Sequence, residues 1–164
     1  MKIFGIAGYS GSGKTTLIER LIPRFTGDGL RVSLIKHAHH SFDVDHPGKD
    51  SYRHRHAGCG EVLVTSHLRW ALMHELRGAR EPTLAEMIEL IAPCDLLLIE
   101  GYKRESFDKL EVYRSTLGEP LLFPQDSRII AIAGDQRVAA ELPQFGIDDV
   151  PAIAAFICRH VGLA

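Results

Sequence analysis

The chain has 164 residues, of which 45% are hydrophobic and 24% are charged, and its formal net charge is −2. This is enough chain for one domain with a sizeable core, the composition is ordinary for a soluble globular protein, and the near-neutral charge gives no reason to expect nucleic-acid binding. No apolar run approaches the length of a membrane span, and the N-terminus lacks a signal-peptide layout. The three cysteines, odd in number and widely spaced, predict a reducing compartment, the cytoplasm.

The N-terminal segment predicts a strand, a glycine loop and a helix. Residues 2–7 form a short apolar run typical of a buried strand, and residues 14–25 place apolar side chains on one helical face. Between them, residues 8–15 read GYSGSGKT, which fits the phosphate-binding pattern G-x-x-x-x-G-K-[ST] in the context that the motif requires. Pro23 predicts a kink or an early end of this helix.

This loop, the P-loop, predicts the binding of a nucleotide with Mg²⁺. Glycines bring backbone N–H groups against phosphate oxygens, and the helix N-terminus adds a positive dipole end. We expect Lys14 to reach the β- and γ-phosphates and the Thr15 hydroxyl to ligate Mg²⁺. The expected phosphate-binding residues are Gly8, Ser10, Gly11, Ser12, Gly13, Lys14, Thr15 and Thr16.

A second predicted strand, residues 31–35, leads into a polar loop on the side where open α/β sheets bind ligands. In and after this loop, Asp43, Asp45 and Asp50 are candidates for a contact to Mg²⁺ or for a catalytic acid, and a solvated polar loop is an equally good interpretation. Asp50 or Ser51 is expected to cap a short helix.

The same region is rich in basic side chains. His37, His39, His40 and His46 allow a transition-metal site, although such histidines more often form hydrogen bonds or lie exposed. Residues 53–56, which read RHRH, are either a solvated helix face or a patch for an anionic partner.

The middle of the chain predicts a hairpin and a capped helix. Residues 61–66 and 69–74 are strand candidates separated by a short turn. A helix is expected over residues 81–91, where Thr83 and Glu86 have the spacing of a capping box.

The run LLLI at residues 96–99 predicts a central strand buried on both faces. Glu100 ends this strand and is the expected acid for Mg²⁺, because Asp95 would lie at the opposite end, about 16 Å away. Further strands are expected at residues 109–113 and 128–133, and a final helix at 150–160. The whole pattern predicts an α/β fold in one domain over residues 1–164: a three-layer P-loop NTPase with a mostly parallel central sheet and an added β-hairpin.

The chain resembles the molybdopterin-guanine dinucleotide biosynthesis adapter family, MobB, over nearly its whole length. The resemblance rests on the P-loop, on IKHAHH at residues 35–40, on DVDHPGKDS at 43–51, and on LIEGYK at 98–103. It implies a GTP-binding protein with Mg²⁺ and weak GTPase activity at most. Such a protein assists the MobA-type guanylyltransferase that attaches GMP to molybdopterin, and it forms a homodimer.

The resemblance also implies functional residues. Lys14, Asp45 and Glu100 are the expected catalytic residues, Thr15 and Glu100 the metal ligands, and Lys36, His37, Asp50 and Lys103 further nucleotide contacts. Many related NTPases carry an additional lysine early in the P-loop, but this loop begins Gly8-Tyr9-Ser10. No Asn-Lys-x-Asp motif is present. Asp135 is a possible acceptor for the guanine N1 and N2 donors, but an ordinary turn aspartate is the better interpretation of this residue.

Three other functions remain open. A small-molecule kinase would use the same P-loop with Asp45 as its base. A metal-delivery GTPase would use the histidine-rich loop. A binding module with a vestigial P-loop would only hold a nucleotide.

Overall fold

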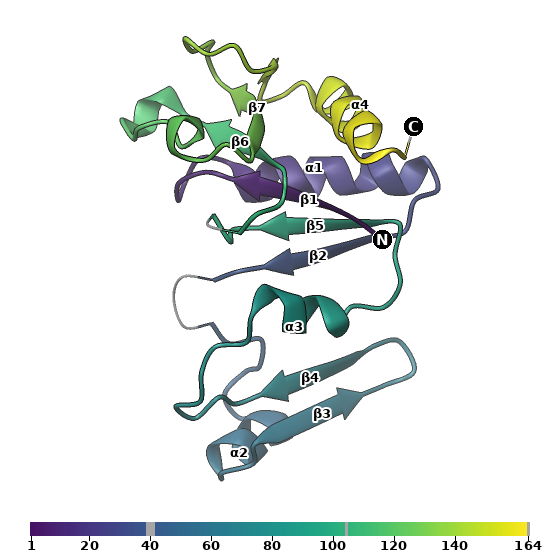
Figure 1. Cartoon of the computed structure of the whole chain (residues 1–164). Helices are drawn as coiled ribbons and strands as arrows, with labels where there is room; N and C mark the ends of the chain where they lie inside the picture. The colour runs from purple at the N-terminus through teal and green to yellow at the C-terminus, as the bar shows by residue number, and fades with distance from the viewer. Residues whose placement is uncertain (39–41, 104, 164) are drawn as a thin grey trace. The chain divides into compact units, whose positions relative to one another are not determined.

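The computed structural model describes residues 1–38, 42–103 and 105–163. The chain divides into two compact units, one formed by Met1–His37 with Met87–Ala164 and the other by Ala38–Glu86 (Figure 1). No helix in these described ranges is long and apolar enough to cross a lipid bilayer.

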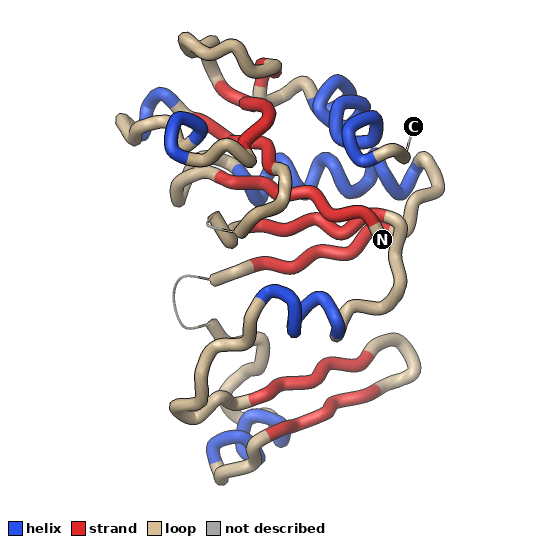
Figure 2. The backbone as a smooth tube through the Cα atoms, in the orientation of Figure 1, coloured by secondary structure: helices blue, strands red, loops and turns tan. Residues whose placement is uncertain are grey.

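A six-stranded sheet with the order β2-β5-β1-β6-β7-β8 forms the centre of the first unit. Its strands are β1 (Lys2–Ala7), β2 (Val32–Lys36), β5 (Leu96–Glu100), β6 (Lys109–Tyr113), β7 (Ile129–Gly134) and β8 (Gln144–Gly146). Every neighbouring pair is parallel, so the carboxyl ends of all six strands meet at one edge. Figure 2 shows the strands in red. Sequence analysis predicted five of these strands and missed β8, which is three residues long.

Strand β5 is central, as its unbroken apolar run predicted. Residues 96–99 are fully buried, and the strand pairs with β1 on one side and β2 on the other. Because both neighbours are parallel to it, Glu100 at its end lies at the edge from which the P-loop leaves β1.

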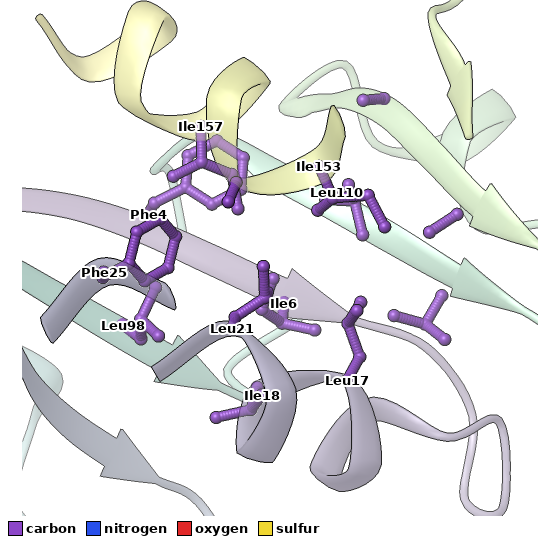
Figure 3. Close-up of a cluster of buried hydrophobic side chains, with 14 of the residues drawn as sticks. Phe4, Ile6, Leu17, Ile18, Leu21, Phe25, Leu98, Leu110, Ile153 and Ile157 are labelled. Atoms are coloured by element: carbon purple, nitrogen blue, oxygen red, sulfur yellow. The ribbon is translucent and has the colours of Figure 1, made fainter. Parts of the chain in front are cut away.

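Two helices pack on one face of this sheet. They are α1 (Lys14–Gly27) and α4 (Val150–Val161), and Figure 3 shows Phe4 and Ile6 of β1 in contact with their apolar faces. Leu21 of α1 and Ile157 of α4 are fully buried in this core. The early helix end expected at Pro23 does not occur, because α1 continues to Gly27.

The second unit contains helix α2 (Asp50–His56) and the antiparallel hairpin of β3 (Glu61–Thr65) and β4 (Trp70–His74). Helix α3 (Leu84–Glu89) follows, and its capping box is confirmed: the Thr83 N–H donates to Glu86 over 2.7 Å, and the Glu86 N–H donates to Thr83 Oγ1 over 3.3 Å. The expected cap of α2 is wrong, since no side chain caps that helix. The α/β class, the parallel sheet and the added hairpin are confirmed.

Candidate functional site

The P-loop joins β1 to α1 at the carboxyl edge of the sheet. Gly8 has a φ of +145°, and a Cβ there would lie 2.5 Å from the carbonyl oxygen of Val112, so only glycine fits. Gly13 stands at the N-cap of α1 in a left-handed conformation, and no side chain caps the helix. The first N–H groups of α1 are therefore left for another acceptor, which is how helix N-termini bind phosphate.

The Lys14 ammonium lies over the start of the loop. Its Nζ donates to the carbonyl oxygens of Gly8 over 3.0 Å and Tyr9 over 2.7 Å. An ammonium has three donors, so one remains for a phosphate oxygen. Burial lowers the pKa of Lys14, and the nearby Glu100 carboxylate partly offsets this effect.

Thr15 and Glu100 meet, although 85 positions separate them in the chain. The Thr15 hydroxyl donates to Glu100 Oε1 over 3.0 Å, and Glu100 is 5% exposed. The Lys36 ammonium lies 3.2 Å from each of the same two oxygens, Thr15 Oγ1 and Glu100 Oε1. The two expected metal ligands thus lie within hydrogen-bond distance of each other, and the Lys36 ammonium lies beside both.

The remaining basic candidates of the first unit lie at the same edge. The Lys103 ammonium lies 4.5 Å from the centre of the Tyr9 ring, beside the start of the P-loop. The His37 N–H donates to the Glu100 carbonyl oxygen over 2.9 Å, which places this residue beside the end of β5.

Asp135 lines a hollow at the carboxyl ends of β7 and β8, with a volume of about 330 Å³. Its carboxylate accepts hydrogen bonds from the Ser115 backbone N–H over 3.0 Å and from the Ser115 hydroxyl over 3.0 Å. The backbone hydrogen bond is the main cause of the lowered pKa of Asp135. The hollow is lined by Ile132, Gly134, Asp135, Gln136, Arg137, Gln144, Phe145 and Gly146.

Sequence analysis found Asp135 but not the rest of this hollow. The Gln144 side chain shapes it by accepting from the Val138 N–H and donating to the carbonyl oxygens of Val138 and Ala140. These bonds hold the loop between β7 and β8. The available signal was weak, because a three-residue strand shows no alternation that a pattern can detect.

The acidic candidates of the second unit surround an arginine. Asp43 accepts from Arg55 Nη2 over 2.8 Å, and Glu75 accepts from Arg55 Nη1 over 2.7 Å. Asp45 accepts from the Ser51 hydroxyl over 3.0 Å, and its other oxygen lies 3.5 Å from Arg55 Nε. The Arg55 side chain is 9% exposed, so the interpretation of residues 53–56 as a solvated or partner-binding patch is wrong for this residue.

The roles expected for Asp50 and for the histidines of the polar loop stay predictions. Asp50 begins α2 and is exposed, and its Oδ1 lies 3.7 Å from Arg53 Nη1. His39 and His40 lie outside the described residues. Within the described part of the chain, no three His, Cys, Asp or Glu side chains gather in a way that could hold a metal ion.

Comparison with known proteins gives consistent matches over most of the chain. The family model described as "Molybdopterin guanine dinucleotide synthesis protein B" matches residues 3–135. The molybdopterin-guanine dinucleotide biosynthesis adapter protein of Escherichia coli strain K12 is 39% identical over 158 residues, which cover 94% of this chain and 90% of that protein. The adapter protein of Haemophilus influenzae is 40% identical over 157 residues, covering 94% and 86%. The crystal structure of Bacillus subtilis MobB superposes with a TM-score of 0.76 at 26% identity and covers 98% of both chains.

Proposed function

Because the chain belongs to the molybdopterin guanine dinucleotide synthesis protein B family and is an adapter protein of molybdopterin-guanine dinucleotide biosynthesis, we propose that it acts by binding GTP with Mg²⁺ at the P-loop. One observation carries this proposal: Lys14, Thr15 and Glu100 converge on one edge of the sheet, with the hydroxyl and the carboxylate 3.0 Å apart. A phosphate chain held by the P-loop would meet all three groups.

The residues present fit Mg²⁺. The ion prefers oxygen ligands and is bound in nucleotide sites by one or two protein oxygens together with phosphates. The Thr15 hydroxyl would be a direct ligand, and the Glu100 carboxylate would act directly or through water. That the Lys36 ammonium already lies 3.2 Å from both oxygens supports a cation position here. Bound Mg²⁺ supplies neutralisation of the charge on the β- and γ-phosphates.

The hollow beside Asp135 is the proposed site of the guanine base. The lowered pKa of Asp135 keeps its carboxylate ionised at neutral pH, so it can accept from the N1 and N2 donors of guanine. GTP hydrolysis would be weak at most, with Lys14 and Glu100 of the first unit as its catalytic residues. Lys36, His37 and Lys103 would provide further contacts to the nucleotide.

The product of the pathway would be made by a partner, the MobA-type guanylyltransferase, acting on molybdopterin in the cytoplasm. The anionic pterin phosphate, or an acidic surface of the partner, requires basic side chains that are exposed. Lys49 and Arg53 are exposed in the second unit and are the proposed charges, whereas Arg55 is buried in ion pairs.

A homodimer is also proposed, formed through the hairpin of the second unit. Leu63 pairs with Leu72 across the two strands, and Trp70 lies on the same face two positions from Leu72. These side chains are 61%, 47% and 68% exposed, an unusual concentration of large apolar groups for a free surface. A second copy of this chain, whose hairpin carries the same face, would cover them.

Reconstituted guanylylation tests the proposal. Purified guanylyltransferase is supplied with molybdopterin and limiting GTP, with and without this protein, and the dinucleotide product is measured. We expect stimulation by the wild type and none by a folded Lys14→Ala variant. Calorimetry should show tighter binding of GTP than of ATP, both in Mg²⁺. A wild type that binds neither nucleotide, or that stimulates at no GTP concentration, would contradict the proposal.

A further inference from the structure

Arg114 lies against the P-loop although it is 100 positions away in sequence. It directly follows β6, which pairs with β1, the strand that leads into the loop. A Cβ placed on Gly13 would lie 3.6 Å from Arg114 Nη2 and 3.8 Å from Arg114 Nε. These two nitrogens form the edge of the guanidinium that can bind two oxygens of a phosphate at once.

The segment that directly follows Arg114 is anchored by hydrogen bonds and by packing against the P-loop. Ser115 donates its N–H and its hydroxyl to the Asp135 carboxylate, each over 3.0 Å. A short 3₁₀ helix, η1 (Ser115–Leu117), follows, and Leu117 Cδ2 lies 3.6 Å from the position of a Cβ on Gly11. Arg114 is therefore held beside the loop by bonds that its own side chain does not make.

The guanidinium itself lacks an anionic partner. In the part of the chain that the structure describes, the Arg114 side chain makes no hydrogen bond or ion pair, and the residue is half-buried. The Asp135 carboxylate is near enough for Arg114 to contribute to its lowered pKa, after the hydrogen bonds from Ser115, but too far for an ion pair. A partly desolvated cation without a partner is unfavourable, and an anion beside Gly13 would relieve it.

The order of the strands shows which part of a nucleotide would lie there. Along the carboxyl edge of the sheet, Glu100 ends β5, the P-loop leaves β1, Arg114 follows β6, and the hollow lies at β7 and β8. A nucleotide with its γ-phosphate near Glu100 and its base in the hollow would pass Arg114 with the phosphates between those two ends.

We propose that Arg114 is a nucleotide-binding residue that contacts oxygens of the α- and β-phosphates, on the side of the P-loop opposite Thr15 and Glu100. The inference rests on the proposed function, the binding of GTP at this loop. It adds a bidentate contact that GTP and GDP share and that does not depend on Mg²⁺.

Calorimetric titration of Arg114→Gln with GTP and with GDP tests this assignment. Both affinities should fall by a similar factor, about tenfold, because the lost contact does not involve the γ-phosphate. The midpoint of the dependence of GTP affinity on Mg²⁺ concentration should stay unchanged. Arg114→Lys should recover only part of the affinity, since an ammonium cannot bind two oxygens with a fixed fork.

Arg128→Gln is the matched control, because Arg128 precedes β7 at the opposite edge of the sheet and pairs with Asp108. It should leave both affinities unchanged. A loss confined to GTP, or unchanged affinities in Arg114→Gln, would overturn the assignment while wild-type binding keeps the proposed function intact. A wild type that binds no nucleotide would overturn both.

A measurement on the wild type covers the case in which Arg114→Gln does not fold. In protein labelled with ¹⁵N-arginine, the Arg114 Nε–H resonance is identified by its absence from the Arg114→Lys spectrum. Addition of GDP should shift this resonance, and a resonance that stays in place at saturation would overturn the assignment.

Discussion

Lys14, Lys36 and Lys103 lie around the P-loop with Glu100 as the acid among them. Burial lowers the pKa of Lys14, the carboxylate raises it, and the other two ammonium groups lower it further. Three cations around one carboxylate leave the site with excess positive charge, which suits a polyphosphate. Each lysine makes a different contact, so each can be tested separately.

Replacing Lys14 by alanine should weaken GTP binding strongly without unfolding the protein. The change removes a charge-assisted contact to the phosphates, worth about 3 kcal/mol or about 100-fold in affinity. Calorimetric titration measures the affinity, and thermal unfolding checks the fold. Lys2→Ala, at the opposite end of β1, should bind GTP normally, and wild-type affinity in folded Lys14→Ala would contradict the proposed site.

Replacing Lys36 by methionine should make Mg²⁺ bind more readily. Its ammonium lies 3.2 Å from Thr15 Oγ1 and from Glu100 Oε1, where it repels an arriving cation and neutralises the carboxylate. GTP affinity should depend on the Mg²⁺ concentration, and the midpoint of this dependence should fall by about threefold in the variant, because one nearby positive charge has been removed. Glu100→Gln should move this midpoint upward, and an unchanged midpoint in Lys36→Met would show that the ammonium does not compete.

At the scale of elements, an ion pair joins the amino ends of two parallel strands. Arg31 precedes β2 and Asp95 precedes β5, and Arg31 Nη2 lies 2.9 Å from Asp95 Oδ1. The Arg31 backbone N–H also donates to Asp95 over 2.8 Å. The side-chain hydrogen bond from Arg31 is the main reason why the pKa of Asp95 falls to about 2. Asp95 thus lies at the opposite end of β5 from the site, as its position in the sequence predicted.

The Asp95→Asn variant should have a lower unfolding temperature at neutral pH. A carboxyl whose pKa is depressed on folding stabilises the folded state above its unfolded pKa, and this contribution is lost as pH falls through the folded value. At pH 6 we expect the unfolding temperatures of the wild type and the variant to differ by only a few degrees, because the pair is largely exposed. The difference should disappear between pH 4 and pH 2, where Asp95 becomes protonated. Thermal unfolding as a function of pH measures it, with Glu119→Gln as an exposed control. A difference that stays constant down to pH 2 would contradict the ionic origin.

At the scale of the whole molecule, the two units carry different features. The first holds the P-loop, Glu100 and the hollow, whereas the second holds the hairpin with its exposed apolar face. The buried Arg55, with Asp43 and Glu75 as partners, connects the start of the second unit with the residue that follows β4. The proposed nucleotide site and the proposed dimer surface therefore belong to different units, and each can be tested by its own variants.

The double variant Trp70→Ser with Leu72→Ser should convert the proposed dimer to monomers. Two large apolar side chains at the centre of an interface contribute about 2 kcal/mol each, so the dissociation constant should rise by a factor of about 1,000. Analytical ultracentrifugation measures the association. GTP affinity per chain should not change, because the P-loop belongs to the other unit.

Leu90→Ser is the control for this experiment, since Leu90 is 69% exposed but lies outside the hairpin. It should leave the association unchanged. A wild type that sediments as a monomer at all concentrations, or a double variant that remains dimeric, would contradict the hairpin interface.

The sequence by itself determined the features that depend on neighbouring residues. The P-loop, the buried run of β5 and the capping box of Thr83 and Glu86 are specified by residue types at short, fixed spacings. Parallel pairing then requires the ends of β1 and β5 to share one edge, so the proximity of Lys14 and Glu100 could be predicted.

Only the tertiary structure decided the features that depend on strand order. The short strand β8 and the burial of Arg55 left no sufficient local signal. Arg114 illustrates the reason: it reaches Gly13 because β6 is the neighbour of β1, and the hollow beside it exists because β7 and β8 come next. Local patterns specify strands and turns, but contacts between residues a hundred positions apart depend on which strands lie side by side, and packing of the whole sheet sets that order.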